Sequence, residues 1–268
     1  MNEIKVKNKI RNIMEDYVFD NIKENMSLID ILYVLYKKFY NDKCKLNNKE
    51  KYNKVIMHSM RVYKNTKIII EYLYSHHMIM SNRDKEDLMI AALFHDIGKL
   101  YKDDENHPYY SACMLECLLG YLKIMTDERL FSISKIVAMH GKKRKFRNNI
   151  NYLTKILRDA DLFDEVCGDS LLELALGNIE SKNNKLTENL NHNDYKFSDM
   201  IIKDRNDEDV KNEILDKINI EENKELYLKL LDEAIEKYKR MTNWEIRHTK
   251  QMKGIRLMDE NTIQINIK

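Results

Sequence analysis

Proline and glycine are scarce in this chain. Of its 268 residues only one is proline (Pro108), and only six are glycine. These two residue types mark most turns and irregular connections, so their near absence argues against a fold rich in sheets or loops. The 43% hydrophobic and 34% charged residues are typical of a helical protein with a sizeable core. The sequence therefore predicts an all-α fold.

Long apolar runs are also lacking. No stretch approaches the length of a membrane-spanning helix. The first residues do not combine a basic segment with a following apolar one, as a secretion signal would. We therefore expect a soluble protein in the cytoplasm with no membrane partner.

The cysteines form neither a disulfide framework nor a zinc-binding pair. Two of them stand four residues apart, as on one face of a helix, and are interpreted as small buried hydrophobic side chains. Free thiols are typical of a reducing cytoplasm. The four positions are Cys44, Cys113, Cys117 and Cys167.

Apolar residues recur at helical spacing along most of the chain. Two helices are predicted within about residues 3–40, the second capped by Ser27. Gly98, Gly120 and Gly141 are expected to interrupt the chain between later helices. Those later helices are predicted from about 54 to 81–84, over 85–95, from Pro108 to about 119, from 126 to 139, from about 151 through Asp161, and over 221–251.

The chain is predicted to have three parts. Residues 1–50 form an N-terminal helical extension, 51–180 the core, and 181–268 a C-terminal extension. The third part contains a polar loop with weak helix over 181–213, followed by a long helix. Isoleucines alternating with polar residues near the C-terminus predict a small β-hairpin.

A histidine–aspartate pair closes a hydrophobic helix in the run Leu93-Phe94-His95-Asp96-Ile97-Gly98-Lys99. Neither side chain belongs at the end of an apolar stretch unless another group satisfies it. Imidazole and carboxylate together suit a divalent ion such as manganese, iron, nickel or zinc. Further candidate ligands lie on either side of the pair: His58, His107, His140 and Asp161. His76, His77, His192 and His248 lie in polar surroundings and are assigned to the surface.

This series of residues resembles the HD-domain superfamily of metal-dependent phosphohydrolases, over about residues 50–170. The string His-Asp-Ile-Gly-Lys at 95–99 is its most specific part. The resemblance implies an HD-like helical bundle and a metal held by His58, His95, Asp96 and Asp161. It also implies that His107 and His140 hold a second ion, with Asp96 bridging the two. The expected cofactor is one or two divalent ions, among Mn, Fe, Ni, Co, Zn and Mg.

The expected function is that of a phosphomonoesterase or phosphodiesterase acting on a nucleotide or another small phosphorylated compound. A metal lowers the pKa of a coordinated water, which makes hydroxide available near neutral pH. Asp96 and Lys99 are the predicted catalytic residues. Lys99 follows Asp96 by one turn and is placed to meet a phosphate as a point charge.

Three further positions are predicted to bind the substrate, each with a plainer alternative. Arg61 follows His58 by three residues on one helical face, and a salt bridge is the alternative. Lys142 and Lys143 begin a basic run that could attract a phosphate or an RNA backbone, or could simply be a solvated connection. Asp159 could orient a ligand histidine or be solvated.

Competing interpretations of the whole chain remain open. Besides a hydrolase, the same ligand set suits a di-iron oxygenase. A third interpretation is a non-catalytic module that senses a nucleotide. The branch of the family that cleaves cyclic dinucleotides is disfavoured, because its His-Glu and Gly-Tyr-Pro signature is missing after His140. The net charge of +2 makes a nucleic acid a less favoured partner. A homo-oligomer is compatible with the sequence, since the alternating isoleucines could pair between chains.

Overall fold

A computed structural model of the protein describes residues 3–15, 26–28, 30–32, 34, 49–102, 104–141, 150–166 and 208–239. These residues form helices, turns and short connections, with no β-strand among them. The all-α prediction is confirmed for this part of the chain. The predicted C-terminal hairpin and most of the polar loop lie outside the described residues.

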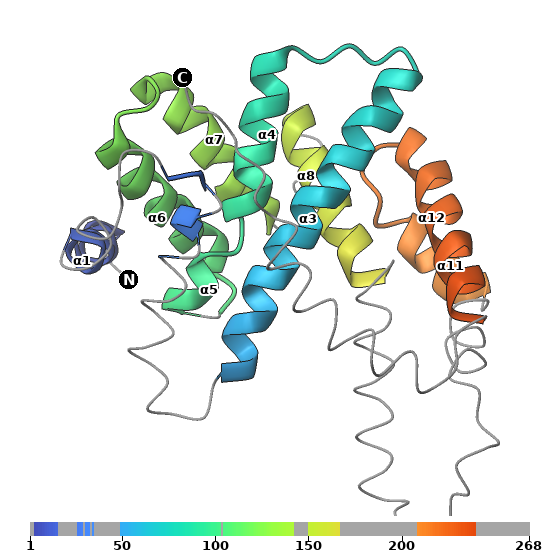
Figure 1. Ribbon diagram of the computed structural model, residues 1–268, viewed down its shortest axis with the longest axis horizontal. Helices are drawn as coiled ribbons and strands as arrows, with labels where there is room; N and C mark the ends of the chain where they lie inside the picture. The colour runs from blue at the N-terminus through green and yellow to red at the C-terminus, as the bar shows by residue number, and fades with distance from the viewer. Residues whose placement is uncertain are drawn as a thin grey trace, which may run out of the picture. The chain divides into compact units, whose positions relative to one another are not determined.

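The chain divides into two compact units, residues 1–160 and 161–262, and the division falls within one continuous helix. The first unit contains α1 (Glu3–Glu15), α3 (Lys49–Ser75), α4 (Asn82–Phe94), α5 (Gly98–Tyr101), α6 (His107–Leu122), α7 (Asp127–His140) and the start of α8 (Tyr152–Val166) (Figure 1). The second unit contains the end of α8, α11 (Glu208–Leu215) and α12 (Glu222–Lys239). The predicted three-part division stays a prediction.

Helix α4 enters the core of the first unit and is buried along its C-terminal half. It packs against α3 on one side and α7 on another, while α6 packs against α1, α5 and α7. Its last four residues are apolar and completely buried, as predicted for a helix that is hydrophobic nearly all round. Because α4 ends inside the core, the residues that follow Phe94 begin there as well.

Short polar side chains begin several of the helices, as the sequence predicts for Ser27. Ser81 caps α4 by accepting a hydrogen bond from the main-chain nitrogen of Asp84, and Thr126 caps α7 in the same way from Arg129. Ser27 accepts a bond from the Asp30 nitrogen, while the Asp30 carboxylate accepts one from Ser27. Pro108 stands in the first turn of α6, where its missing N–H costs nothing.

Two of the predicted glycine breaks differ in the structure. Helix α6 continues through Gly120 to Leu122 and ends at Lys123, which has left-handed backbone geometry (φ 50°). Gly98 begins the short helix α5 after a three-residue turn. Gly141 does cap α7, as expected.

The second unit has its own apolar side chains. On α12, Leu226, Tyr227, Leu231 and Ala234 are buried, and the ring of Tyr227 lies 5.6 Å from that of Phe163 on α8. The predicted helix over 221–251 is confirmed as far as Lys239, where the described residues end.

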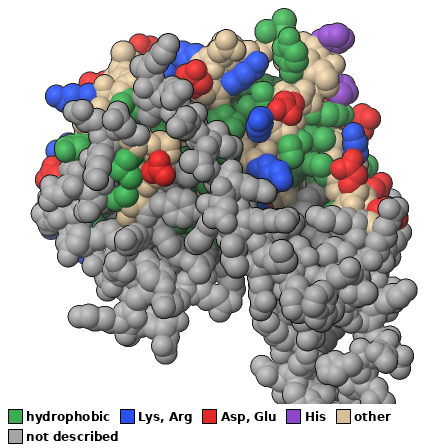
Figure 2. All heavy atoms as spheres, in the orientation of Figure 1, with side chains coloured by type: hydrophobic (Ala, Val, Ile, Leu, Met, Phe, Trp, Pro, Cys, Tyr) green, Lys and Arg blue, Asp and Glu red, His purple; other side chains and the backbone are tan. Residues whose placement is uncertain are grey.

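The remaining sequence expectations concern side chains and membranes. Cys113 is buried in α6 and Cys117 half-buried, both as free thiols, whereas Cys44 and Cys167 lie outside the described residues. His76 and His77 are exposed, as predicted, and His192 and His248 are not described. None of the described helices combines the length and hydropathy of a membrane-crossing segment. Positive and negative side chains are interspersed on the face drawn in Figure 2.

Candidate metal centre

The histidine–aspartate pair follows α4 directly and is buried. His95 is 0% exposed and Asp96 is 1% exposed. An ionised carboxylate in such a place is costly unless charges of opposite sign surround it. The groups around Asp96 must therefore balance its charge.

Three imidazoles are fixed in the same way by the main chain that precedes them. In each, Nδ1 bonds to the main-chain carbonyl oxygen three residues earlier, and a carbonyl can only accept, so Nδ1 must carry the proton. This leaves the Nε2 lone pair available to a cation and holds the ring in one orientation. The bonds run from His95 to Ala92 at 2.8 Å, from His107 to Asp104 at 2.8 Å, and from His140 to Val137 at 2.6 Å.

The Nε2 atoms converge on the carboxylate of Asp96. Those of His107 and His140 lie 3.1 and 3.5 Å from Oδ1. Those of His58 and His95 lie 3.2 and 3.6 Å from Oδ2, which also accepts from Nζ of Lys99. Yet no described residue makes a well-oriented hydrogen bond to the buried Oδ1. A buried carboxylate oxygen without such a bond calls for another positive group.

The pKa values follow from this geometry. Burial alone would raise the pKa of the Asp96 carboxyl, but the surrounding imidazoles, that of His95 foremost, hold it well below its ordinary value. Burial tends to lower the pKa of His107, but the close, negatively charged carboxylate of Asp96 raises it overall. The arrangement thus favours a positive charge beside Asp96, which either protons or a metal ion can supply.

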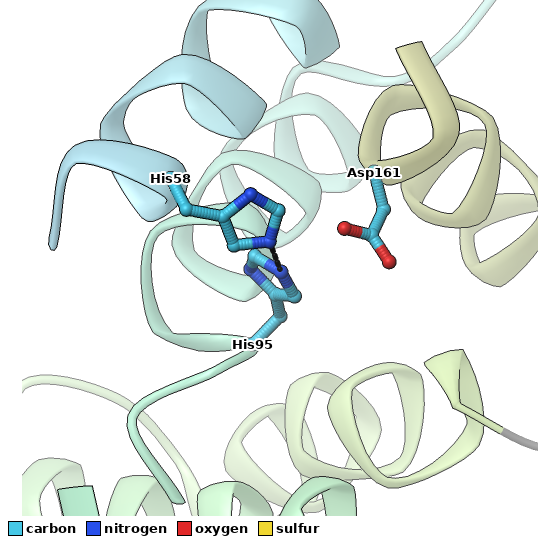
Figure 3. Close-up of side chains that lie close together, drawn as sticks. All are labelled: His58, His95 and Asp161. Atoms are coloured by element: carbon cyan, nitrogen blue, oxygen red, sulfur yellow. Dashed lines mark hydrogen bonds between the residues drawn. The ribbon is translucent and has the colours of Figure 1, made fainter. Parts of the chain in front are cut away.

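Two overlapping groups of side chains have the donor atoms that a divalent ion needs. One consists of His58, His95 and Asp161, which point toward one another from α3, the end of α4 and α8 (Figure 3). The other consists of His95, Asp96 and His140. Within each group the ligand atoms lie within 4.8 Å of one another. Ligands at about 2.1 Å from one ion stand up to about 4.2 Å apart, so small side-chain movements suffice for binding.

Helix α6 approaches Gly98 and Gly141 closely. These two contacts hold the helix ends that carry His107 and His140 near Asp96. Gly98 donates its main-chain N–H to Oγ of Ser111, and that hydroxyl donates to the carbonyl oxygen of His107. A Cβ on Gly98 would overlap main-chain atoms of both His107 and Ser111. A Cβ on Gly141 would lie 2.5 Å from Cγ of Pro108. Both glycines are therefore positions where α6 leaves no room for a side chain.

Helix α8 is tied to its neighbours close to Asp161. Asn65 of α3 donates a hydrogen bond to the carbonyl oxygen of Ala160 at 3.2 Å. Arg158 donates two bonds to main-chain carbonyls at the end of α7. These contacts fix the helix just before its candidate ligand.

The predicted substrate-binding residues fare differently. Lys99 lies beside Asp96 with its side chain 28% exposed, so the side chain is only partly buried. Arg61 is half-buried on α3, three residues after His58. Lys142 and Lys143 lie outside the described residues. Asp159 is completely buried, so its solvated interpretation is wrong.

Sequence reasoning did not identify Ser111, Arg158 or Asn65. All three act through main-chain atoms beside a candidate ligand rather than through ligand side chains. Arg158 and Ser111 do lie within one turn of Asp161 and His107 in the sequence, which was an available signal. Asn65 lies two helical turns after His58, and its position gave no such signal in the sequence.

Comparison with known proteins identifies the family of this region. Residues 55–166, which include all six candidate metal ligands, match the family model described as HD domain. Members of that family are mostly metal-dependent hydrolases that bind divalent ions. No curated protein and no solved structure matches the chain.

Proposed function

We propose, on the premise that residues 55–166 form an HD domain, that this protein is a metal-dependent phosphohydrolase. Its substrate is a nucleotide or another small phosphorylated compound, and its reaction is the hydrolysis of a phosphomonoester or phosphodiester. The observation that carries the proposal is the buried Oδ1 of Asp96, which no described residue satisfies although imidazole nitrogens surround it. Groups so arranged suit a divalent ion better than a hydrogen-bonded core.

The candidate ligands are assigned to two ion positions. His58, His95, Asp96 and Asp161 would hold one ion, and His107 and His140 would complete a second place beside Asp96. The bound metal supplies Lewis-acid chemistry, which lowers the pKa of water and neutralises charge on phosphoryl oxygens. The main-chain bonds to His95, His107 and His140 keep their Nε2 atoms pointed inward, so little reorganisation is needed.

Lys99 is the first candidate for binding the phosphate. Its ammonium group lies against Oδ2 of Asp96, and its side chain is partly exposed. A cation there can exchange its carboxylate partner for a phosphoryl oxygen. Arg61, Lys142 and Lys143 remain further candidates for the same task. The net charge of only +2 favours a small substrate over a long polyanion.

A substrate panel tests the proposal. The purified chain is stripped with a chelator, reloaded separately with Mn²⁺, Co²⁺, Ni²⁺, Fe²⁺ and Mg²⁺, and assayed with phosphomonoesters and phosphodiesters. We expect at least one ion to restore hydrolysis, and Asp96→Ala to abolish it with the helical circular dichroism unchanged. Asp127→Ala, which removes an exposed aspartate of α7, is the matched control and should keep its activity.

Two outcomes would contradict the proposal. Retained turnover in the Asp96→Ala variant would exclude a role for this carboxylate. A chain that hydrolyses no phosphate ester with any ion, but consumes oxygen with iron bound, would be an oxygenase. Elemental analysis of a His107→Ala variant separately tests the second ion, because an unchanged metal content would leave a single-ion enzyme.

A further inference from the structure

The C-terminal end of α7 is held by a side chain from another helix. Arg158 of α8 donates from Nε to the carbonyl oxygen of His140 and from Nη2 to that of Met139, both at 2.8 Å. The last carbonyl groups of a helix have no partner within it, and cationic side chains are favourable there. A single guanidinium group thus satisfies two successive carbonyls.

Within the described helix, the last turn of α7 offers no side-chain cation that faces its own carbonyl groups. The one basic residue in its last turn is His140, whose ring is turned inward and bonded to Val137. His140 is 6% exposed and its Nε2 atom lies 3.5 Å from Asp96. Arg158 therefore supplies the charge that this helix end would otherwise take from the histidine.

The geometry of the guanidinium group matters as well as its charge. Its planar fork binds two acceptors in fixed directions, which an ammonium group does not do. With the carbonyls of residues 139 and 140 both held, the main chain that carries the His140 ring has little freedom to rotate. A small rotation there would move Nε2 away from its place in the group His95, Asp96 and His140.

We propose that Arg158 is a positioning residue of the metal centre, which holds His140 in the orientation that binds the ion. The inference rests on the metal-dependent function proposed above. A positioning role differs from a purely structural one in a testable way: the effect of Arg158 on metal affinity must depend on the His140 side chain.

A double-mutant cycle tests this statement. The dissociation constant for Mn²⁺ is measured by calorimetry, without substrate, on the full chain and on Arg158→Gln, His140→Ala and the double variant. We expect Arg158→Gln to weaken binding about tenfold in the wild-type background, as losses of groups that orient metal ligands commonly do. In the His140→Ala background the same change should have no effect, because the group it positions is gone. Arg158→Lys, which keeps the charge but not the fork, should recover only part of the affinity.

Arg129→Gln is the matched control. Arg129 also joins two helices, since it donates from α7 to Asp87 and Glu86 of α4, but at the opposite end of α7 from His140. Its loss should lower the thermal midpoint as the loss of Arg158 does, and should leave the Mn²⁺ dissociation constant unchanged. This comparison separates metal positioning from general stability.

The outcomes distinguish this inference from the proposed function. Unchanged affinity in both Arg158 variants, or an equal loss in the two backgrounds of the cycle, would overturn the role of Arg158. A chain that binds Mn²⁺ and obeys the cycle, but hydrolyses no phosphate ester, would overturn only the proposed reaction. If the wild-type chain binds no divalent ion, both proposals are wrong.

Discussion

At the scale of single residues, Gly98 and Gly120 have opposite surroundings. The position where a Cβ of Gly98 would stand is occupied by main-chain atoms of α6, next to the candidate ligand His107. A Cβ on Gly120 would meet only Cδ2 of Leu130, at 3.7 Å, which is an ordinary contact. The same substitution should therefore have opposite effects at the two positions.

We predict that Gly98→Ala destabilises the fold by about 1–3 kcal/mol, because α5 and α6 must separate to admit the methyl group. The shift would also displace His107, so the variant should bind less metal. Gly120→Ala should stabilise the fold by about 0.5–1 kcal/mol, since alanine favours a helix interior. Urea denaturation of the metal-free variants measures both changes. Equal effects of the two substitutions would show that the close packing at Gly98 is not a constraint.

The role of Gly98 illustrates what the sequence could not provide. Its position after His-Asp-Ile was apparent, and a break in the chain was a reasonable interpretation of a glycine there. The actual requirement comes from the approach of α6, which begins nine residues later and is set by tertiary packing. Arg158 is a similar case, because its partners are carbonyls of a different helix.

At the scale of the elements, the sequence predicted the starts of α6, α7, α8 and α12 to within one residue, but placed those of α3 and α4 five and three residues too late. Ser81 and Thr126 act locally, on main-chain groups three residues away, and such caps are visible in a sequence. The end of α6 was misplaced because a glycine costs a helix only about 1 kcal/mol, which burial of apolar neighbours outweighs. Leu118 and Leu119, both fully buried, provide that burial just before Gly120.

The cap of α4 yields the prediction at this scale. Ser81 Oγ accepts a hydrogen bond from the Asp84 nitrogen at 3.0 Å, at the start of the helix that leads to His95. Ser81→Ala should lower the free energy of unfolding by about 1 kcal/mol, whereas Ser81→Asn, which retains an acceptor, should cost much less. Ser132→Ala, at an exposed position within α7, serves as a control for the loss of a serine. Denaturant titration distinguishes the three, and an equally destabilised Ser81→Asn would argue against the capping role.

At the scale of the whole molecule, the candidate ligands come from distant parts of the chain. His58 and Asp161 are separated by more than a hundred residues, and the others come from α6, α7 and the end of α4. In an unfolded chain these groups do not form a site. A metal that binds only the folded form must therefore stabilise it.

The corresponding prediction concerns thermal unfolding. With free ion at 100 times its dissociation constant, the stabilisation should be about 2.7 kcal/mol relative to the chelated protein. Asp96→Ala should abolish the dependence of the melting temperature on the ion. His76→Ala, which removes an exposed histidine outside the site, should retain it. A wild-type melting temperature that does not respond to any divalent ion would contradict the metal centre.

The candidate ligands of the centre could be predicted, because their residue types and their order along the chain are apparent from the sequence. The side chains of His58, His95, Asp96, His140 and Asp161 all belong to groups that could hold an ion, and His107 lies beside Asp96. What could not be predicted is the support around them, since Ser111, Asn65 and Arg158 contact main-chain atoms that any sequence possesses. The identity of the substrate could not be predicted either, because the residues that determine substrate specificity need not be metal ligands.

His95 belongs to both groups of candidate ligands, but its Nδ1 atom is committed to Ala92, so one electron pair is left to donate. Two cations cannot share that pair. If two ions are present together, only one has His95 in its coordination sphere, and the other must rely on Asp96, His107 and His140. The two positions would then differ in their number of protein donors, and the poorer one should fill last and empty first.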